Sequence, residues 1–444
     1  MTATLSRPRR TAAIKAAAGT TPGRYRLWSL AAAVLLVVAT VTASASAAQM
    51  RSSTRRAESS SGPVLVATQQ LVSSLAEADA AASAAFLSGR DEDPEQRRLY
   101  EEALGRANEQ VEEIAALAGK DPEVRAVLGR VSVQVTRYAG LVEAARASNR
   151  NATADANGYL VSAVQLAEQL VDGDARVLTD GAQATFGHDQ SDRNRGFLVA
   201  AVALLAAVAV LALGQLRMVR IARRIVNPPL ALATVLALVA LGLLAYANRA
   251  SGNDMADARR QGYDSIVLTA RLGSAGFGAK ASETLAVITG DTGQRREADV
   301  RAAQVATGPL SAGAAEVIRR GEPQSVPPGL VHDAAVAADS PRERAAVAEA
   351  GLRWQRYQNT VATLRAAPNA AAAKAVAVGP ANADFNGFNF SVQSILGQNR
   401  DQFLAGLGSA TDRTARTPSL VLLLLLGALA AMFWGFQLRI NDYR

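Results

Sequence analysis

The residues that most often carry catalytic or metal chemistry are scarce in this chain. It contains two histidines and no cysteine, which excludes thiol nucleophiles and zinc–thiolate sites. His188 and His332 each stand beside an aspartate, in GHDQSD and VHDAAV. Neither belongs to the HxxxH or HExxH spacing that brings two imidazoles to one metal ion. Because isolated loop histidines are ordinarily solvated, we expect no enzyme activity, no bound metal and no cofactor.

Large aromatic residues are the remaining candidates for a binding site. Three of them occupy core-facing positions of expected bundle helices, and the stretch FNGFNFSVQ adds three phenylalanines close together. Rings at such positions ordinarily fill the core, but they also line small-molecule pockets between helices. Both interpretations remain open at this point. The candidate ligand or partner pocket consists of Tyr138, Trp354, Tyr357, Phe385, Phe388 and Phe390.

Four uncharged apolar runs predict membrane spans, at residues 27–48, 197–216, 230–247 and 419–438. Each run approaches the roughly 20 residues needed to cross the hydrocarbon core of a bilayer. No charge lies inside any of them, which argues against a transporter or a proton relay. The stretch TASASAAQM also offers Ala-x-Ala cleavage sites after the first run. Cleavage of that run as a signal peptide is therefore the alternative to a first span.

The charge distribution predicts the orientation of these spans. Residues 1–26, 217–229 and 439–444 together carry a net charge of +11, whereas residues 49–196 carry −6 and residues 248–418 carry +3. Positive charge next to spans marks cytoplasmic pieces. We therefore expect a multi-pass protein of the cell membrane, in contact with lipid, with both termini in the cytoplasm and two large domains outside. Basic residues confined to such pieces argue against nucleic-acid binding.

Both expected outside domains are predicted to be helical bundles. Apolar residues recur in steps of three and four over residues 64–85, 100–118, 124–142 and 347–364, the pattern of bundle helices. In the first domain, Gly, Pro and Asp separate four helices near 62–90, 94–118, 121–149 and 155–186. The second domain holds more glycine and proline, so we expect broken helices there. A shift of 201 residues aligns the start of one domain with that of the other, which predicts an internal duplication. The fold class is thus an all-α membrane protein with four spans and two bundles.

The loop between the second and third runs is a basic island. Its candidate coupling residues are Arg220, Arg223, Arg224, Pro228 and Pro229. The order Arg-Arg-Ile-Val-Asn-Pro resembles the point where the second span of chemoreceptors and sensor kinases enters the cytoplasmic relay module. Here another apolar run follows at once, so the resemblance covers the sensing half, which in that family is a four-helix bundle. The alternative is a tight turn held at anionic headgroups.

In length, four-span layout, two helical outside domains and composition rich in alanine and arginine, the chain resembles GlnX-type actinobacterial membrane proteins. These belong to the module of a glutamine-binding lipoprotein and protein kinase G. The resemblance implies an extracellular amino-acid-binding lipoprotein and a cytoplasmic Ser/Thr kinase as partners. It transfers no functional residue. We therefore expect a non-enzymatic subunit that relays a nutrient signal across the membrane. The alternatives are a direct small-molecule sensor, or a structural scaffold of the cell envelope; a homodimer stays open.

Overall fold

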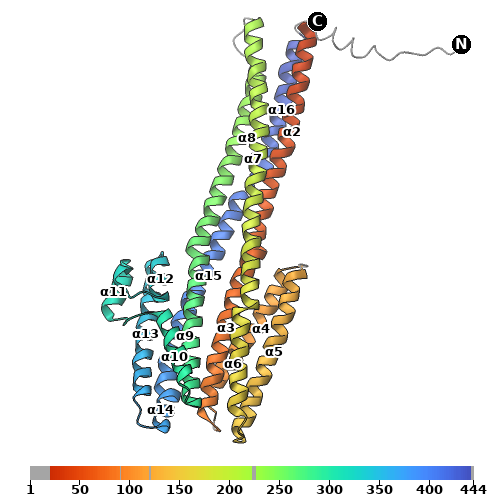
Figure 1. Ribbon diagram of the computed structural model, residues 1–444. Coiled ribbons are helices and arrows are strands. Elements are labelled where there is room, and N and C mark those ends of the chain that lie inside the picture. Colours follow the sequence, from red (N-terminus) through yellow and green to blue (C-terminus); the bar gives the residue numbers. More distant parts are fainter. Residues whose placement is uncertain (1–20, 91, 120–121, 223–226, 442–444) are drawn as a thin grey trace, which may run out of the picture. The chain divides into compact units, whose positions relative to one another are not determined.

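The computed structural model describes residues 21–90, 92–119, 122–222 and 227–441. Within these ranges all regular elements are helices, and no strand occurs (Figure 1). The chain forms two compact units. The membrane-helix unit consists of Met1–Arg56, Gly187–Asp254 and Gly408–Arg444, and the bundle unit consists of Ala57–Phe186 and Met255–Leu407. Both segments predicted as separate helical domains contribute to this one bundle unit.

Four helices of the described residues are long and apolar enough to cross a membrane. They contain the four runs that the sequence indicates, so the prediction of four long apolar helices is confirmed. The helices are α2 (Thr21–Arg56), α7 (Asp174–Ala222), α8 (Pro228–Asp257) and α16 (Thr417–Asn441). Because these runs are helical, their backbone groups hydrogen-bond to one another. Because alanine and leucine dominate the runs, their side chains carry no charge into the apolar region.

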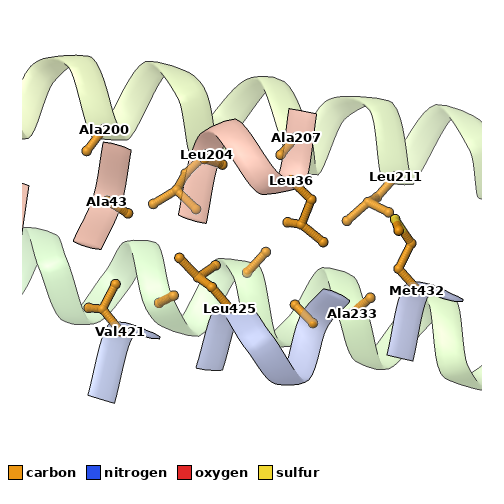
Figure 2. Close-up of a cluster of buried hydrophobic side chains, with 14 of the residues drawn as sticks. Leu36, Ala43, Ala200, Leu204, Ala207, Leu211, Ala233, Val421, Leu425 and Met432 are labelled. Carbon is orange, nitrogen blue, oxygen red and sulfur yellow. The ribbon is translucent and has the colours of Figure 1, made fainter. Parts of the chain in front are cut away.

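The membrane-helix unit is packed around a stripe of small and branched apolar residues. Leu36 and Ala43 of α2, Leu204 and Leu211 of α7, and Leu425 of α16 are among its buried members (Figure 2). Alanine at the contact positions lets neighbouring backbones approach closely, which is the usual basis of helix association in a bilayer. Leucine side chains on the other faces stay exposed in the unit, as expected of a surface that faces lipid.

The ends of these four helices that adjoin the basic pieces lie together. The Arg217 guanidinium, near the end of α7, lies 5.0 Å from the Trp28 ring centre near the start of α2. Gln215 of α7 donates a hydrogen bond to the carbonyl oxygen of Leu230, near the start of α8, at 2.8 Å. The Asn227 amide, just before α8, donates to the carbonyl oxygen of Gly435 near the end of α16 at 3.1 Å. The described helix ends that border the three basic pieces therefore lie at the same end of this unit.

The first half of the bundle unit follows the predicted helices closely. It contains the π-helical segment η1 (Ala57–Ser61), α3 (Gly62–Ser88), α4 (Pro94–Leu117), α5 (Pro122–Arg150) and α6 (Ala156–Asp172). One boundary differs, because the helix expected over 155–186 is divided between α6 and α7 at Gly173. A Cβ atom at Gly173 would lie 2.7 Å from the Gln169 carbonyl oxygen. Glycine is thus required for this local break, which the seam pattern alone does not reveal.

The start of α4 has the predicted N-cap. The Asp93 side chain accepts a hydrogen bond from the backbone N–H of Glu95 at 3.0 Å, and Pro94 occupies the first helical position. We expect Asp93→Ala to lower the free energy of unfolding by about 1 kcal/mol, because one N–H at the helix end loses its acceptor. Asp93→Asn keeps an acceptor and serves as the control in urea unfolding followed by circular dichroism. Equal losses in both variants would contradict a capping role. The second predicted cap, Asp121, lies outside the described residues.

The second half of the bundle unit has the shorter, interrupted helices that its glycine and proline content predicts. Its elements are η2 (Ala258–Tyr263), α9 (Asp264–Thr289), α10 (Thr292–Val305), α11 (Ala312–Arg320), η3 (Pro323–Ser325), α12 (Leu330–Ala337), α13 (Pro341–Arg365), α14 (Ala370–Val376), η4 (Ala377–Ala381) and α15 (Asn382–Ala415). Helix α9 packs against α3, so the two halves meet along these long helices.

Two backbone features recur in both halves at the 201-residue shift. The π-helical segments η1 and η2 begin at Ala57 and Ala258. Helices α3 and α9 both end at a glycine in a positive-φ conformation, with φ of 88° at Gly89 and 71° at Gly290. Positive φ is strained for residues with a Cβ atom, so both ends depend on glycine. These coincidences add backbone geometry to the sequence match.

Candidate functional site

Four of the six candidate aromatic residues form one buried cluster in the bundle unit. Trp354 and Tyr357 come from α13, and Phe385 and Phe388 come from α15; none is more than 2% exposed. The Trp354 ring centre lies 5.1 Å from that of Phe388, and the Tyr357 ring centre lies 5.1 Å from that of Phe385. Such tilted and edge-on contacts are typical of a packed aromatic core. These four rings join α13 to α15 within the core.

The other two aromatic candidates lie apart from this cluster. Tyr138 of α5 is 1% exposed and packs in a separate core with Tyr100 of α4, at 6.4 Å between ring centres. Phe390 of α15 is 72% exposed. A single pocket that uses all six side chains is thus not formed. The candidate coupling residues are also divided: Arg220 belongs to α7 and Pro228 and Pro229 begin α8, whereas Arg223 and Arg224 lie outside the described residues.

Of the two histidines, the structure describes the side chain of His332. His332 of α12 contacts the neighbouring Asp333 at 3.3 Å and is partly exposed. His188 belongs to α7. Among the described residues, no group of three or more His, Asp or Glu side chains is placed to hold a metal ion. The candidate site is instead a group of charged side chains in the bundle unit, between α3, α6, α9 and α10.

A small cavity of about 80 Å³ lies between α3, α6, α9 and α10. Two carboxylates and one guanidinium line it, from Asp79, Glu168 and Arg301, together with the Ser274 residue. Asp79 is 7% exposed. Burial raises the pKa of the Asp79 carboxyl to about 7, and the nearby Glu168 charge acts in the same direction. The cavity therefore holds an acid that is poised to gain or lose a proton near neutral pH.

The Arg301 guanidinium sets the charge balance at the edge of this cavity. It donates to Glu168 at 2.6 Å and to Glu297 at 2.8 Å, which ties α10 to α6. The approach depends on Gly278 of α9, where a Cβ atom would lie 2.3 Å from the Arg301 Nη1 atom. None of the ion pairs found among the described residues includes Asp79. Within the described residues, the buried carboxyl of Asp79 thus has no ion-pair partner, while the Arg301 guanidinium beside it pairs with Glu168 and Glu297.

A larger groove of about 640 Å³ adjoins the small cavity, because Ser274 and Arg301 line both. Three arginines face this groove, namely Arg176, Arg271 and Arg301, with Glu297 and Asp333 opposing them. Gly329 and Leu330, at the N-terminal end of α12, complete one wall. That helix has no side-chain cap at Gly329, and an uncapped helix start favours an anion. The outer groove is therefore positive where the inner cavity is negative.

A second buried charge lies on α9. Lys280 is 4% exposed, and its ammonium nitrogen lies 4.7 Å from the Phe385 ring centre. Burial lowers the pKa of Lys280 to about 7, although the charges of Asp93 and Glu77 oppose that shift. Glu77 itself is buried and accepts from Arg106 at 2.6 Å and from Asn389 at 2.8 Å. This network connects α3 to α4 and α15 through charged hydrogen bonds.

Sequence reasoning missed Asp79, Lys280, Glu168 and Arg301. Each stands in a helical stretch rich in alanine and charge, where a charged residue is ordinarily solvated. The available signal was local: Asp79 lies within LAEADAAASAAF and Lys280 within GFGAKASETLAV, each among small residues. A helix whose faces are nearly all small or apolar is buried on all sides. The few charged residues of such a helix are then buried, and their burial requires a structural or functional reason.

Comparison with known proteins gives one match. A family model described as an actinobacterial sensor domain matches residues 53–191. No curated protein and no solved structure matches the chain. The matched residues include α3, α4, α5 and α6, hence the first half of the bundle unit, and they include Asp79 and Glu168 of the inner cavity. Together with four helices apolar enough to span a membrane, this match fits a sensor membrane protein.

Proposed function

We propose that this chain is a non-enzymatic membrane sensor subunit that receives a signal outside the cell and relays it to a cytoplasmic partner. The observation that carries the proposal is the match of residues 53–191 to an actinobacterial sensor domain. Helix α7 supports the relay, since one unbroken helix contains both sensor residues and an apolar span. A shift of that helix is the kind of change such sensors transmit.

The bundle unit is proposed to lie outside the cell, with the three basic pieces in the cytoplasm. The chain has no cysteine, so a single introduced thiol reports its own location. Ala126 of α5 is exposed, and we expect Ala126→Cys to react with a membrane-impermeant maleimide in intact cells. Thr11→Cys, in the basic N-terminal piece, should react only after permeabilisation. The reverse pattern of labelling would overturn the orientation, and the cysteine-free parent measures the background.

The proposed source of the signal is an extracellular solute-binding lipoprotein for acidic or amide amino acids, with a Ser/Thr kinase as the cytoplasmic partner. This part of the proposal comes from the resemblance to GlnX-type proteins. Tagged full-length protein is cross-linked in actinobacterial cells, with and without glutamate, glutamine or aspartate. Recovery of one binding lipoprotein in amounts that depend on the amino acid would support the coupling role. Recovery of envelope proteins with no dependence on the amino acid would instead favour a scaffold.

A second candidate function is a sensor that binds its small molecule directly. The inner cavity and the arginine-lined groove favour it, because both lie inside the bundle unit and both present charged groups to a ligand. Such a sensor would respond to a ligand in the absence of any binding lipoprotein.

We further infer that the two halves of the bundle unit arose by duplication of one sensor unit. The recurring π-helical segments and positive-φ glycines support this inference. So do Tyr138 and Tyr357, which stand at the same place in the similar stretches RYAGLVEAAR and RYQNTVATLR and are both buried. On that reading the second half is a diverged copy, and charged residues that differ between copies are candidates for specificity.

A further inference from the structure

The inner cavity and the adjoining groove differ in their balance of charge, although Arg301 lines the cavity and Glu297 and Asp333 line the groove. At the inner end stand the carboxyl of Asp79, which is 7% exposed, and the carboxylate of Glu168. At the outer end stand the Arg176 and Arg271 side chains and the uncapped start of α12. Arg301 lies at the junction, because it lines both spaces. The two ends thus favour ligand groups of opposite sign.

This distribution restricts the ligand. A simple anion held by the arginines would lie near the two carboxyl groups of the cavity, and a simple cation held by those carboxyl groups would lie near the Arg301 guanidinium. A molecule with an anionic group at one end and a protonated amine at the other satisfies both ends. The amine must carry N–H groups, because a buried carboxylate is stabilised by charge-assisted hydrogen bonds from its partner.

The size of the inner cavity restricts the ligand further. Its volume is about 80 Å³, and its uncharged walls are the small residues Ala76, Ala167, Gly278 and Ala281. A bulky or branched amine would collide with these helices, since close-packed interiors do not yield easily. An unbranched ammonium group fits, and the rest of the molecule then extends toward the groove of about 640 Å³.

We propose that the bundle unit binds a small zwitterion, with its ammonium group at Asp79 and Glu168 and its carboxylate at Arg271 and the start of α12. Asp79 then acquires the cationic partner that it lacks within the described residues. Because the cavity lies between α6 of the first half and α9 and α10 of the second, the ligand joins the two halves. The inference rests on the second candidate function, a sensor that binds its small molecule directly, and gives that sensor its ligand class.

The test uses purified full-length protein in lipid nanodiscs and a series of unbranched probes. Glycine, β-alanine, 4-aminobutyrate and 6-aminohexanoate place the two charges at increasing separations, and acetate and ethylamine each carry one charge. We expect at least one zwitterion to bind at least about tenfold more tightly than either single-charge probe in calorimetry, because two charged contacts are made at once. If none of the zwitterions exceeds both single-charge probes, the proposal is wrong.

Substitutions test which residues bind each end of the zwitterion. Asp79→Asn and Arg271→Gln should each weaken binding of the best zwitterion by about tenfold or more, whereas Arg319→Gln, an exposed arginine on α11, should leave it unchanged. Arg301 is avoided, since its loss also breaks the ion pairs to Glu168 and Glu297. Binding by Asp79→Asn with native affinity would overturn the proposal. No partner protein is present in this measurement, so failure here is separate from failure of the cross-linking experiment on signal relay.

Discussion

Replacing Asp79 by asparagine is expected to stabilise the protein above pH 7 and to leave its stability unchanged near pH 4. In the folded chain the pKa of Asp79 is raised from 3.8 to about 7. Between these pH values the folded state binds more protons than the unfolded state, so the free energy of unfolding falls as pH rises. The asparagine variant has no proton to lose there. Its advantage at pH 8 should be on the order of 2–4 kcal/mol, given about 1.4 kcal/mol per pKa unit.

The measurement is urea or thermal unfolding in detergent at pH 4, 6 and 8, followed by circular dichroism. The groups that face Asp79 are Glu168 on α6, Arg301 on α10 and Tyr138 on α5, and the asparagine leaves all three in place. Glu77→Gln is the matched control, because Glu77 is equally buried on α3 but is paired with Arg106. We expect that variant to be destabilised at pH 8. A loss of stability in Asp79→Asn at pH 8 would show that the native chain satisfies this carboxylate.

Phe388→Ala should produce the largest loss of stability among single substitutions in the aromatic cluster, by about 3–5 kcal/mol. The ring is fully buried and lies 5.1 Å from Trp354 and 5.6 Å from Phe385, between ring centres. A Cβ atom added at Gly276 of α9 would lie 2.4 Å from the Phe388 ring, so the neighbouring helix is already in contact. The cavity left by alanine therefore cannot close through a small shift.

Phe390→Ala is the control for this substitution. It lies two residues further along α15 and makes the same change of side chain, but its ring is 72% exposed. We expect its effect on the free energy of unfolding to stay within about 0.5 kcal/mol. Equal losses in the two variants would contradict the assignment of Phe388 to the core. A pocket among these rings predicts something else, namely a nearly unchanged stability in Phe388→Ala together with altered ligand binding.

The helical architecture could be read from the sequence because its signals are periodic and long. Uncharged runs marked α2, α7, α8 and α16, and the steps of three and four marked α3, α4, α5 and α13. Trp354, Tyr357 and Val361 occupy core positions as their spacing predicts. The division of the fourth predicted helix at Gly173 was missed. Gly173 stands between Asp172 and Asp174, and Asp-Gly is a turn signal, so the break was visible in the sequence and the helix was predicted through it.

The candidate site was the part that sequence could not supply. Asp79 and Arg301 are 222 positions apart and meet only because α3 and α10 both pack against α9. Pairing at such separation leaves no periodic trace in one sequence. The aromatic residues were candidates for a pocket because their side chains are large, but large aromatic side chains pack in cores as often as they bind ligands. In an alanine-rich bundle, the charged side chains that the fold buries are a better guide to a small cavity.

The π-helical segments give the chain places where the phase of a helix can change. A π turn holds one residue more than an α turn, and one residue corresponds to about 100° around a helix. The residues that follow η1 or η2 are therefore rotated by that angle from where an uninterrupted α-helix would put them. Both segments lie where the chain passes between its two units, at Ala57 and close after Met255. Exchange of a π turn for an α turn there would rotate one stretch of helix about its axis relative to the next. Such a rotation would not require the helix to shift along its axis.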